Sequence, residues 1–258
     1  TGALVTGAAL VSTFKASADS VAYMQETKHG HHLNRSKKRF DKLIKEGELK
    51  GDDAAYAEKI LKLQKRNIRN KKADKAVDIL VDVGTIGVSL LALFSVSFAP
   101  AVALAWGVAA VGIAVGMKIA DYYLNKKKKR DSVEDYLQLD NIEGLGLPDN
   151  YINAPKEKHK EYQKLMKEHM AAELGFTSTE SLYRHMMKKY AEFLYNNLFY
   201  VDGDKSKPIY VKSGYDRTET SNACYQAVKS LGLRIRYPKN EKVEPKPTVA
   251  QIAAKLAG

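Results

Sequence analysis

Three histidines close together are the first residues in this chain whose type and spacing could do chemistry. His29, His31 and His32 lie within four positions, and imidazole nitrogens are common metal ligands. A zinc protease site would hold two histidines four residues apart on a helix with a glutamate between them, and a structural zinc site would add cysteines. Neither pattern is present, and Lys28 and Arg35 beside the cluster oppose a cation. We therefore expect no metal and no other cofactor.

The remaining candidates for catalysis are a single thiol and a short acidic turn. Cys224 has no histidine or basic residue within two positions to activate it, so we expect a buried thiol rather than a nucleophile. Asp202 and Asp204 flank Gly203, but this turn is too short for a calcium loop. Phosphate-binding glycine loops, kinase motifs and nucleophile elbows are absent from the sequence. The sequence therefore favours a protein without enzymatic activity.

The strongest pattern is a run of 35 residues, 83–117, that contains no charged side chain. Pro100 lies near its middle, and the segment from Phe98 to Pro100 is a plausible turn because proline cannot continue a helix from the preceding turn. The pattern predicts a helical hairpin over residues 77–124. Each arm has about 17 to 22 residues, which compares with the roughly 17 to 25 needed to span a bilayer.

Basic residues flank both ends of this hairpin. Residues 59–75 carry eight Lys or Arg, and residues 126–130 are all Lys or Arg. A hairpin with both ends on the cytoplasmic face shows this distribution under the positive-inside rule, and such clusters attract anionic lipid. The residues predicted to bind lipid are Lys71, Lys72, Lys75, Lys126, Lys127, Lys128, Lys129 and Arg130. The residues predicted to insert are Leu90, Leu91, Phe94, Phe98, Trp106, Val111 and Ile113.

Two interpretations of the hairpin stay open at this point. A helix that is apolar on all sides must be shielded from water, and either protein or lipid can shield it. In the first interpretation the hairpin is the permanent core of a soluble bundle, and in the second it inserts into a membrane. A hybrid, in which a buried hairpin is exposed on insertion, is also open. Gly112 and Gly116 form a GxxxG pair that permits close helix packing in lipid.

Apolar residues recur at helical spacing outside the hairpin as well. Helices are predicted over residues 1–27, from residue 54, at 183–198, at 219–231 and at 249–257. The helix starts carry capping residues, namely Asp52 and Asp53, Thr177 with Glu180, and Thr248. In the first helix a narrow seam, where a neighbour could approach closely, is formed by Ala3, Gly7, Leu10, Phe14, Ser17, Val21 and Met24.

The C-terminal part has a more mixed character. Short strands are predicted at residues 200–201, 209–211 and 233–237. Glycines and prolines mark a linker at 141–155. The predicted fold is therefore mainly α, with a helical bundle around the apolar hairpin in residues 1–140 and a smaller α+β or helical region in residues 156–258.

The two apolar arms also carry a resemblance to known proteins. Residues 90–94 read LLALF in one arm, and residues 109–116 read AAVGIAVG in the other. This hairpin resembles the buried hydrophobic hairpin of colicin-type pore-forming domains, and it is similar in outline to hydrophobic segments of secreted effectors from intracellular bacteria. The resemblance covers about 50 of 258 residues and implies a bacterial toxin or effector that acts on membranes.

Net charge and cysteine content limit the partners and the compartment. The net charge of +12 favours acidic partners, which are anionic lipid, an acidic protein or nucleic acid. With one cysteine the fold needs no internal disulfide, so it is compatible with a reducing compartment. The sequence predicts a non-enzymatic protein that engages anionic membranes and is membrane-associated or secreted into a host cell. The alternative is a soluble helical module that binds an acidic protein or nucleic acid.

Overall fold

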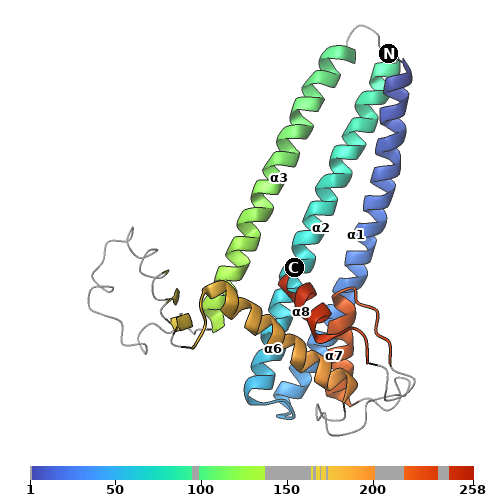
Figure 1. The fold of residues 1–258 in the computed structure, drawn as a ribbon. Helices are drawn as coiled ribbons and strands as arrows, with labels where there is room; N and C mark the ends of the chain where they lie inside the picture. Colours follow the sequence, from blue (N-terminus) through green and yellow to red (C-terminus); the bar gives the residue numbers. More distant parts are fainter. Residues whose placement is uncertain are drawn as a thin grey trace. The chain divides into compact units, whose positions relative to one another are not determined.

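The computed structural model describes residues 2–94, 99–136, 164, 167–168, 170–172, 174–200, 218–237 and 244–258. These residues form a mainly α-helical bundle, as the sequence predicts (Figure 1). The chain divides into two compact units, one made of residues 1–117 and 190–258 and the other of residues 118–189. The predicted linker at 141–155 lies outside the described residues, and the domain boundary placed there stays a prediction.

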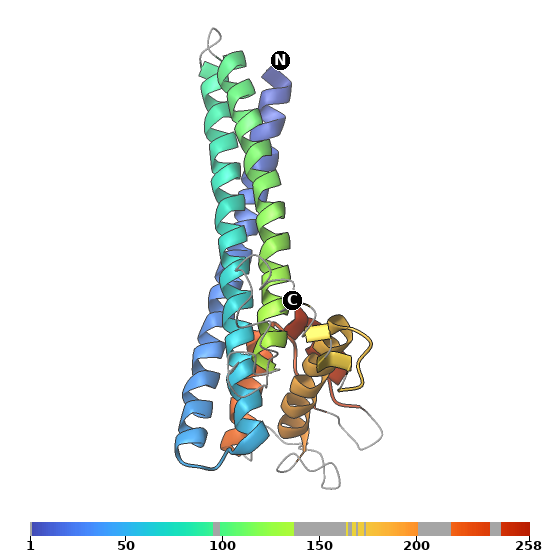
Figure 2. The same ribbon diagram turned by 90° about the vertical axis from the view of Figure 1, so that its left-hand side faces the viewer.

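Two long antiparallel helices form the frame of the first unit. α1 (Gly2–Lys45) and α2 (Gly51–Phe94) lie side by side (Figures 1 and 2). α1 extends well past residue 27, where the sequence pattern had ended it. The turn between the helices contains Gly47 and Gly51, whose φ angles of 73° and 56° favour glycine. The predicted turn at these two glycines is therefore confirmed.

The uncharged run forms the end of α2 and the beginning of the next helix. α2 ends at Phe94, and α3 (Ala99–Tyr136) begins immediately before Pro100. Proline is favoured in the first turn of a helix because its missing N–H would have no partner there. The first arm continues the cationic helix that starts at Gly51, and the second arm continues through the basic residues 126–130. Two helices are therefore present where the sequence predicts the two hairpin arms. The turn was placed too late, however, because Ala99 and Pro100 belong to α3.

The half of the α1–α2 pair that lies away from the uncharged run packs against the C-terminal helices. α7 (Glu219–Ser230) contacts α1, and α8 (Val249–Ala257) contacts α2. Ser36 Oγ donates to the carbonyl of Ala223 at 2.9 Å, and an ion pair joins Arg39 to Glu219. The buried apolar residues here are Leu33, Phe40, Leu43, Ala57, Ile60, Leu61, Ile68, Ala223, Ala227, Val228, Ile252 and Leu256. Residues from both ends of the chain thus share one core.

The cap of the last helix is the predicted one, and the helix before it has a cap that was not predicted. Thr248 caps α8 in a capping box with Gln251, and both predicted C-terminal helices are present at the predicted positions. Thr218 Oγ1 accepts from the N–H of Ser221 at 3.1 Å and so caps α7. These short helices are defined locally by their caps, so the sequence locates them well.

The predicted strand at 233–237 is only a single bridge in the structure. The backbones of Arg236 and Lys246 exchange two hydrogen bonds of 2.7 and 3.1 Å. The pairing does not extend toward Thr248, because the N–H of Thr248 donates to Gln251 Oε1 at 3.0 Å in the cap of α8. No strand is present within the described ranges. The strand predicted at 209–211 lies outside them, as does residue 201 of the strand predicted at 200–201.

The second unit joins the last part of α3 to the first part of α6 (Thr179–Phe199). Within this unit, Lys129 Nζ donates to both carboxylate oxygens of Glu180 at 3.1 and 3.2 Å. The cap of α6 lies one residue after the predicted one, because Ser178 and Ser181 exchange reciprocal hydrogen bonds of 3.1 Å. The predicted apolar stripe of α6 is confirmed by burial of Tyr183, Met187, Tyr190, Leu194 and Leu198.

Candidate membrane-binding surface

The second arm of the hairpin presents apolar side chains to solvent. Leu104 is 74% exposed and Val111 is 64% exposed. Five exposed aliphatic residues of α3 recur at spacings of three and four, namely Leu104, Val108, Val111, Val115 and Ile119, and Val102 is exposed as well. The other face is half-buried at Trp106, Ala110, Ile113 and Met117. Among the described residues, no protein core therefore covers this face of the second arm.

The first arm is also partly open to solvent. Leu80, Val83 and Leu90 are exposed on α2. The backbones of Leu91 and Phe94 belong to α2, but their side chains lie outside the described part of the structure, as does all of Phe98. Their predicted insertion stays a prediction.

Trp106 joins the two arms. Its indole Nε1–H donates to Thr85 Oγ1 at 3.0 Å, and the Thr85 hydroxyl donates to the carbonyl of Val81 at 2.9 Å. The ring lies directly over Gly84, where an added Cβ would come within 2.1 Å of it. This contact needs a glycine on α2, because any larger residue would displace the indole. Trp106 was predicted as an inserting residue, and the structure adds its role in joining α2 to α3.

An acidic residue marks the beginning of the uncharged run. Asp82 is 4% exposed, and its Oδ1 lies 3.9 Å from Lys15 Nζ. Its Oδ2 is buried and has no hydrogen-bond partner among the described residues. Burial raises the pKa of Asp82, Lys15 opposes that rise, and Asp19 and Asp78 add to it. The sequence pattern located Asp82 at the start of the arm but did not reveal that it is buried against α1.

Three lysines near the middle of α2 were predicted to bind lipid, and the structure gives them different surroundings. Lys75 Nζ donates to Asp19 at 2.9 Å and to Asp78 at 3.0 Å, and these hydrogen bonds raise its pKa. Lys72 Nζ lies 5.5 Å from the centre of the Tyr23 ring. Lys71 is exposed. The cations are thus partly engaged by α1, and their lipid-binding role stays a prediction.

In the polybasic run at 126–130, three of the five cations are buried or already paired with a carboxylate. Lys128 is only 1% exposed, so it does not lie on the surface, and Lys129 pairs with Glu180. Arg130 lies 3.4 Å from Asp131 and 3.7 Å from Glu134. These three residues are less available to a headgroup than the sequence suggested.

The two remaining cations of this run are open to solvent. Lys126 and Lys127 are exposed, and neither forms an ion pair within the described residues. Lys126 Nζ lies 5.9 Å from the Tyr122 ring centre, and the exposed Tyr122 and Tyr123 rings contact each other edge to face at 5.7 Å. Tyrosine and lysine together favour the boundary between hydrocarbon and water.

Two histidines of the cluster, His29 and His32, contact other side chains of the protein. His29 Nδ1 lies 3.3 Å from Glu26, and the imidazole ring packs against Gly232. His32 Nδ1 lies 2.8 Å from Gln226 Oε1 on α7. No group of three metal-ligating side chains is found in the described segments.

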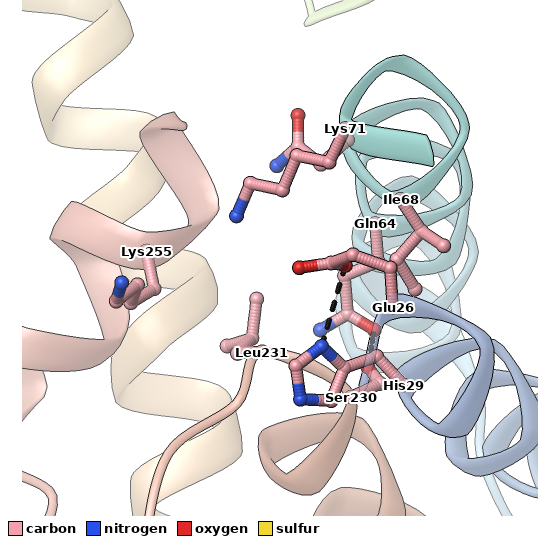
Figure 3. A pocket seen from close by; sticks show the side chains of 9 residues that line it. Glu26, His29, Gln64, Ile68, Lys71, Ser230, Leu231 and Lys255 are labelled. Atoms are coloured by element: carbon pink, nitrogen blue, oxygen red, sulfur yellow. Dashed lines mark hydrogen bonds and ion pairs between the residues drawn. The ribbon is translucent and has the colours of Figure 1, made fainter. Parts of the chain in front are cut away.

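A small polar pocket lies beside His29 (Figure 3). It lies between α1, α2 and the C-terminal helices, and Figure 3 shows Glu26 and Lys71 pointing into it. Its interior of about 10 Å³ holds about one water molecule. Its lining residues are Glu26, His29, Gln64, Asn67, Ile68, Lys71, Ser230, Leu231 and Lys255. This pocket is too small for an organic substrate.

The only thiol of the chain is inaccessible. Cys224 is fully buried in α7, as predicted. Burial, reinforced by the negative charge of Asp53, raises the pKa of the Cys224 thiol far above its usual range. A thiol that stays protonated in this way is a poor nucleophile.

Comparison with known proteins adds no relative. No protein-family model matches the chain, and neither a curated protein nor a solved structure matches it. By length and composition, one helical stretch in the described residues could cross a membrane, at Leu104–Glu134, and its most apolar part is not buried.

Proposed function

We propose that this protein binds anionic membranes and inserts the uncharged hairpin, residues 83–117, into the hydrocarbon layer. The observation that carries the proposal is the exposure of Leu104, Val108, Val111 and Val115 along α3. Covering one such side chain completely contributes about 1.5 to 3 kcal/mol, and large apolar patches on a soluble surface mark sites of interaction. The basic residues beside the run support anionic lipid as the partner.

The length of the second arm supports lipid as the partner. Residues 99–117 belong to one unbroken helix, α3, and none of these residues is charged. At a rise of 1.5 Å per residue this segment is about 28 Å long, which is close to the roughly 30 Å thickness of the hydrocarbon core. Nucleic acid, the partner in the alternative hypothesis, offers phosphates and base edges and would leave these aliphatic side chains uncovered. Secretion into a host cell stays a prediction.

The single tryptophan of the chain provides a direct test. Trp106 lies within the proposed inserted segment, so its fluorescence reports on the hairpin alone. We expect lipids brominated along their acyl chains to quench Trp106 when the protein is mixed with vesicles of phosphatidylglycerol and phosphatidylcholine. Vesicles with headgroup-labelled quenchers should quench it less. Equal emission with and without brominated chains would contradict insertion.

A charge placed on the exposed face of α3 tests whether the quenching depends on insertion of that face. Val111→Asp should leave the fold intact in vesicle-free buffer, because the side chain faces solvent. It should weaken quenching by brominated lipid, because an aspartate in the middle of a bilayer costs about 3 kcal/mol on insertion scales. Unfolding of this variant in buffer would favour a buried hairpin instead.

A further inference from the structure

We infer that the first part of α1, residues 2–14, enters the membrane beside the hairpin, so that three helices form the inserted surface. This inference rests on the proposed function, since it assigns a further segment to the same surface. The sequence places these residues more than 60 positions before the hairpin. The packing of α1 along α2 brings the two segments together.

The charge boundary on α1 coincides with the charge boundary on α2. Lys15 is the first charged side chain of α1, and Asp82 is the last charged side chain of α2 before the uncharged run. These two residues pair with each other at 3.9 Å. Asp19, one turn later on α1, pairs at 2.9 Å with Lys75, about two turns earlier on α2. In an antiparallel pair this register sets residues 2–14 beside α2 from residue 83 onward. Both helices therefore become charge-free at the same level.

The outer face of this part of α1 is apolar and uncovered. Phe14 is 76% exposed, and Leu10 and Val11 are also exposed. The opposite face, where Ala9 and Ser12 are half-buried or buried, is turned toward α2. The exposed side chains of α1 thus continue the apolar surface of the hairpin to which α1 is packed.

Two hydroxyl groups in this region, those of Thr13 and Thr85, are hydrogen-bonded to their own helix. Thr13 Oγ1 donates to the carbonyl of Ala9 at 2.8 Å although the residue is exposed. Thr85 on α2 makes the same bond to Val81. Hydrocarbon offers no hydrogen-bond partner, so a hydroxyl can enter it only when bonded in this way. These side chains therefore suit lipid as the occupant of the surface.

Site-specific labelling tests the inference. Because the only native cysteine is fully buried, an introduced surface cysteine is the accessible thiol. The variants Phe14→Cys, Val111→Cys and Lys38→Cys each receive the environment-sensitive dye NBD. With vesicles of phosphatidylglycerol and phosphatidylcholine, we expect dye at positions 14 and 111 to shift to shorter wavelength. We also expect dithionite in the outer solution to bleach both several-fold more slowly, while dye at exposed Lys38 keeps its rate.

The three positions separate the possible failures. Protection at 111 without protection at 14 would overturn the inference and leave the proposed function intact. Protection at neither position would overturn both. Protection at 14 without vesicles, increasing with protein concentration, would show that a second copy of the chain covers α1, and it would also overturn the inference.

Discussion

At the scale of single residues, the charge of Asp82 has an unusual environment. Its carboxylate is buried against α1, one oxygen lacks a hydrogen bond within the described residues, and its only close cation is the exposed Lys15. Because its pKa is raised, the folded state binds the proton more tightly than the unfolded state does. The contribution of Asp82 to stability is therefore largest at acidic pH and is lost as the pH rises above the usual aspartate range.

A substitution at Asp82 tests this sign. Asp82→Asn should raise the free energy of unfolding at pH 7 by about 1 kcal/mol, because it removes an unsatisfied buried charge. The gain should shrink toward pH 4, where the native carboxyl is increasingly protonated. Asp78→Asn is the matched control, since Asp78 is paired with Lys75 at 3.0 Å and should gain nothing. Chemical denaturation at several pH values measures both variants, and a gain independent of pH would contradict this account.

Two glycines of α2 offer a second test at the same scale. Alanine at 84 would place its Cβ about 2.1 Å from the Trp106 ring, whereas alanine at 87 would meet nothing within 4 Å. Gly84→Ala should therefore displace the indole, break its hydrogen bond to Thr85 and shift the Trp106 emission. Gly87→Ala should leave the emission unchanged and stabilise the helix by up to about 1 kcal/mol. Identical spectra for the two variants would contradict the contact.

At the scale of elements, α1 has two halves with different partners. Phe40 is fully buried and lies 6.2 Å from the ring of Phe193, while Phe14 on the same helix faces solvent. Phe40→Ala should lower the free energy of unfolding by about 3 to 5 kcal/mol, since it empties a packed site. Phe14→Ala should change it by less than about 0.5 kcal/mol in buffer. Urea denaturation compares them, and a large loss at Phe14 would mean that protein covers it.

The same helix shows what sequence patterns can and cannot predict. Apolar periodicity identified the helix and a seam that includes Leu10, Phe14, Val21 and Met24, yet all four are exposed. In this part of α1 the less exposed positions are small residues such as Ala9, Ser12 and Ala16, together with Asp19, which pairs with Lys75 of α2. The spacing of apolar residues cannot reveal a packing face made of small and charged residues. The partners of such residues are set only when a distant segment packs against them.

Local sequence signals predicted where helices begin and end better than they predicted which side chains are buried or paired. Glycines and caps located the turn at Gly47 and the start of α8, since each depends on a few neighbouring residues. Pro100 indicated the break between the arms, although Ala99 and Pro100 themselves belong to α3. The polybasic run was visible in the sequence, but the burial of Lys128 was not, and the pairing of Lys129 with Glu180 depends on a residue 51 positions away. Composition alone treats all five cations as equivalent.

At the scale of the whole molecule, the net charge of +12 should draw the protein to anionic surfaces before any helix inserts. Association with phosphatidylglycerol vesicles should weaken as salt is added, because exposed charges are screened beyond about 8 Å at physiological ionic strength. The apolar contribution to binding, which follows when the hairpin inserts, should not be screened by salt. Binding should therefore fall with salt but persist in part.

The exposed and the engaged cations of the run can be compared directly. Replacing Lys126 and Lys127 by Gln should weaken vesicle association by up to roughly 30-fold at low salt, given about 1 kcal/mol for each cation near the surface. The matched double variant Lys129→Gln and Arg130→Gln removes the same charge from side chains already paired with Glu180 and Glu134, and it should weaken association less. Co-sedimentation with vesicles measures both. Equal losses would mean that net charge alone governs binding, and the absence of loss in both would mean that this run does not face the membrane.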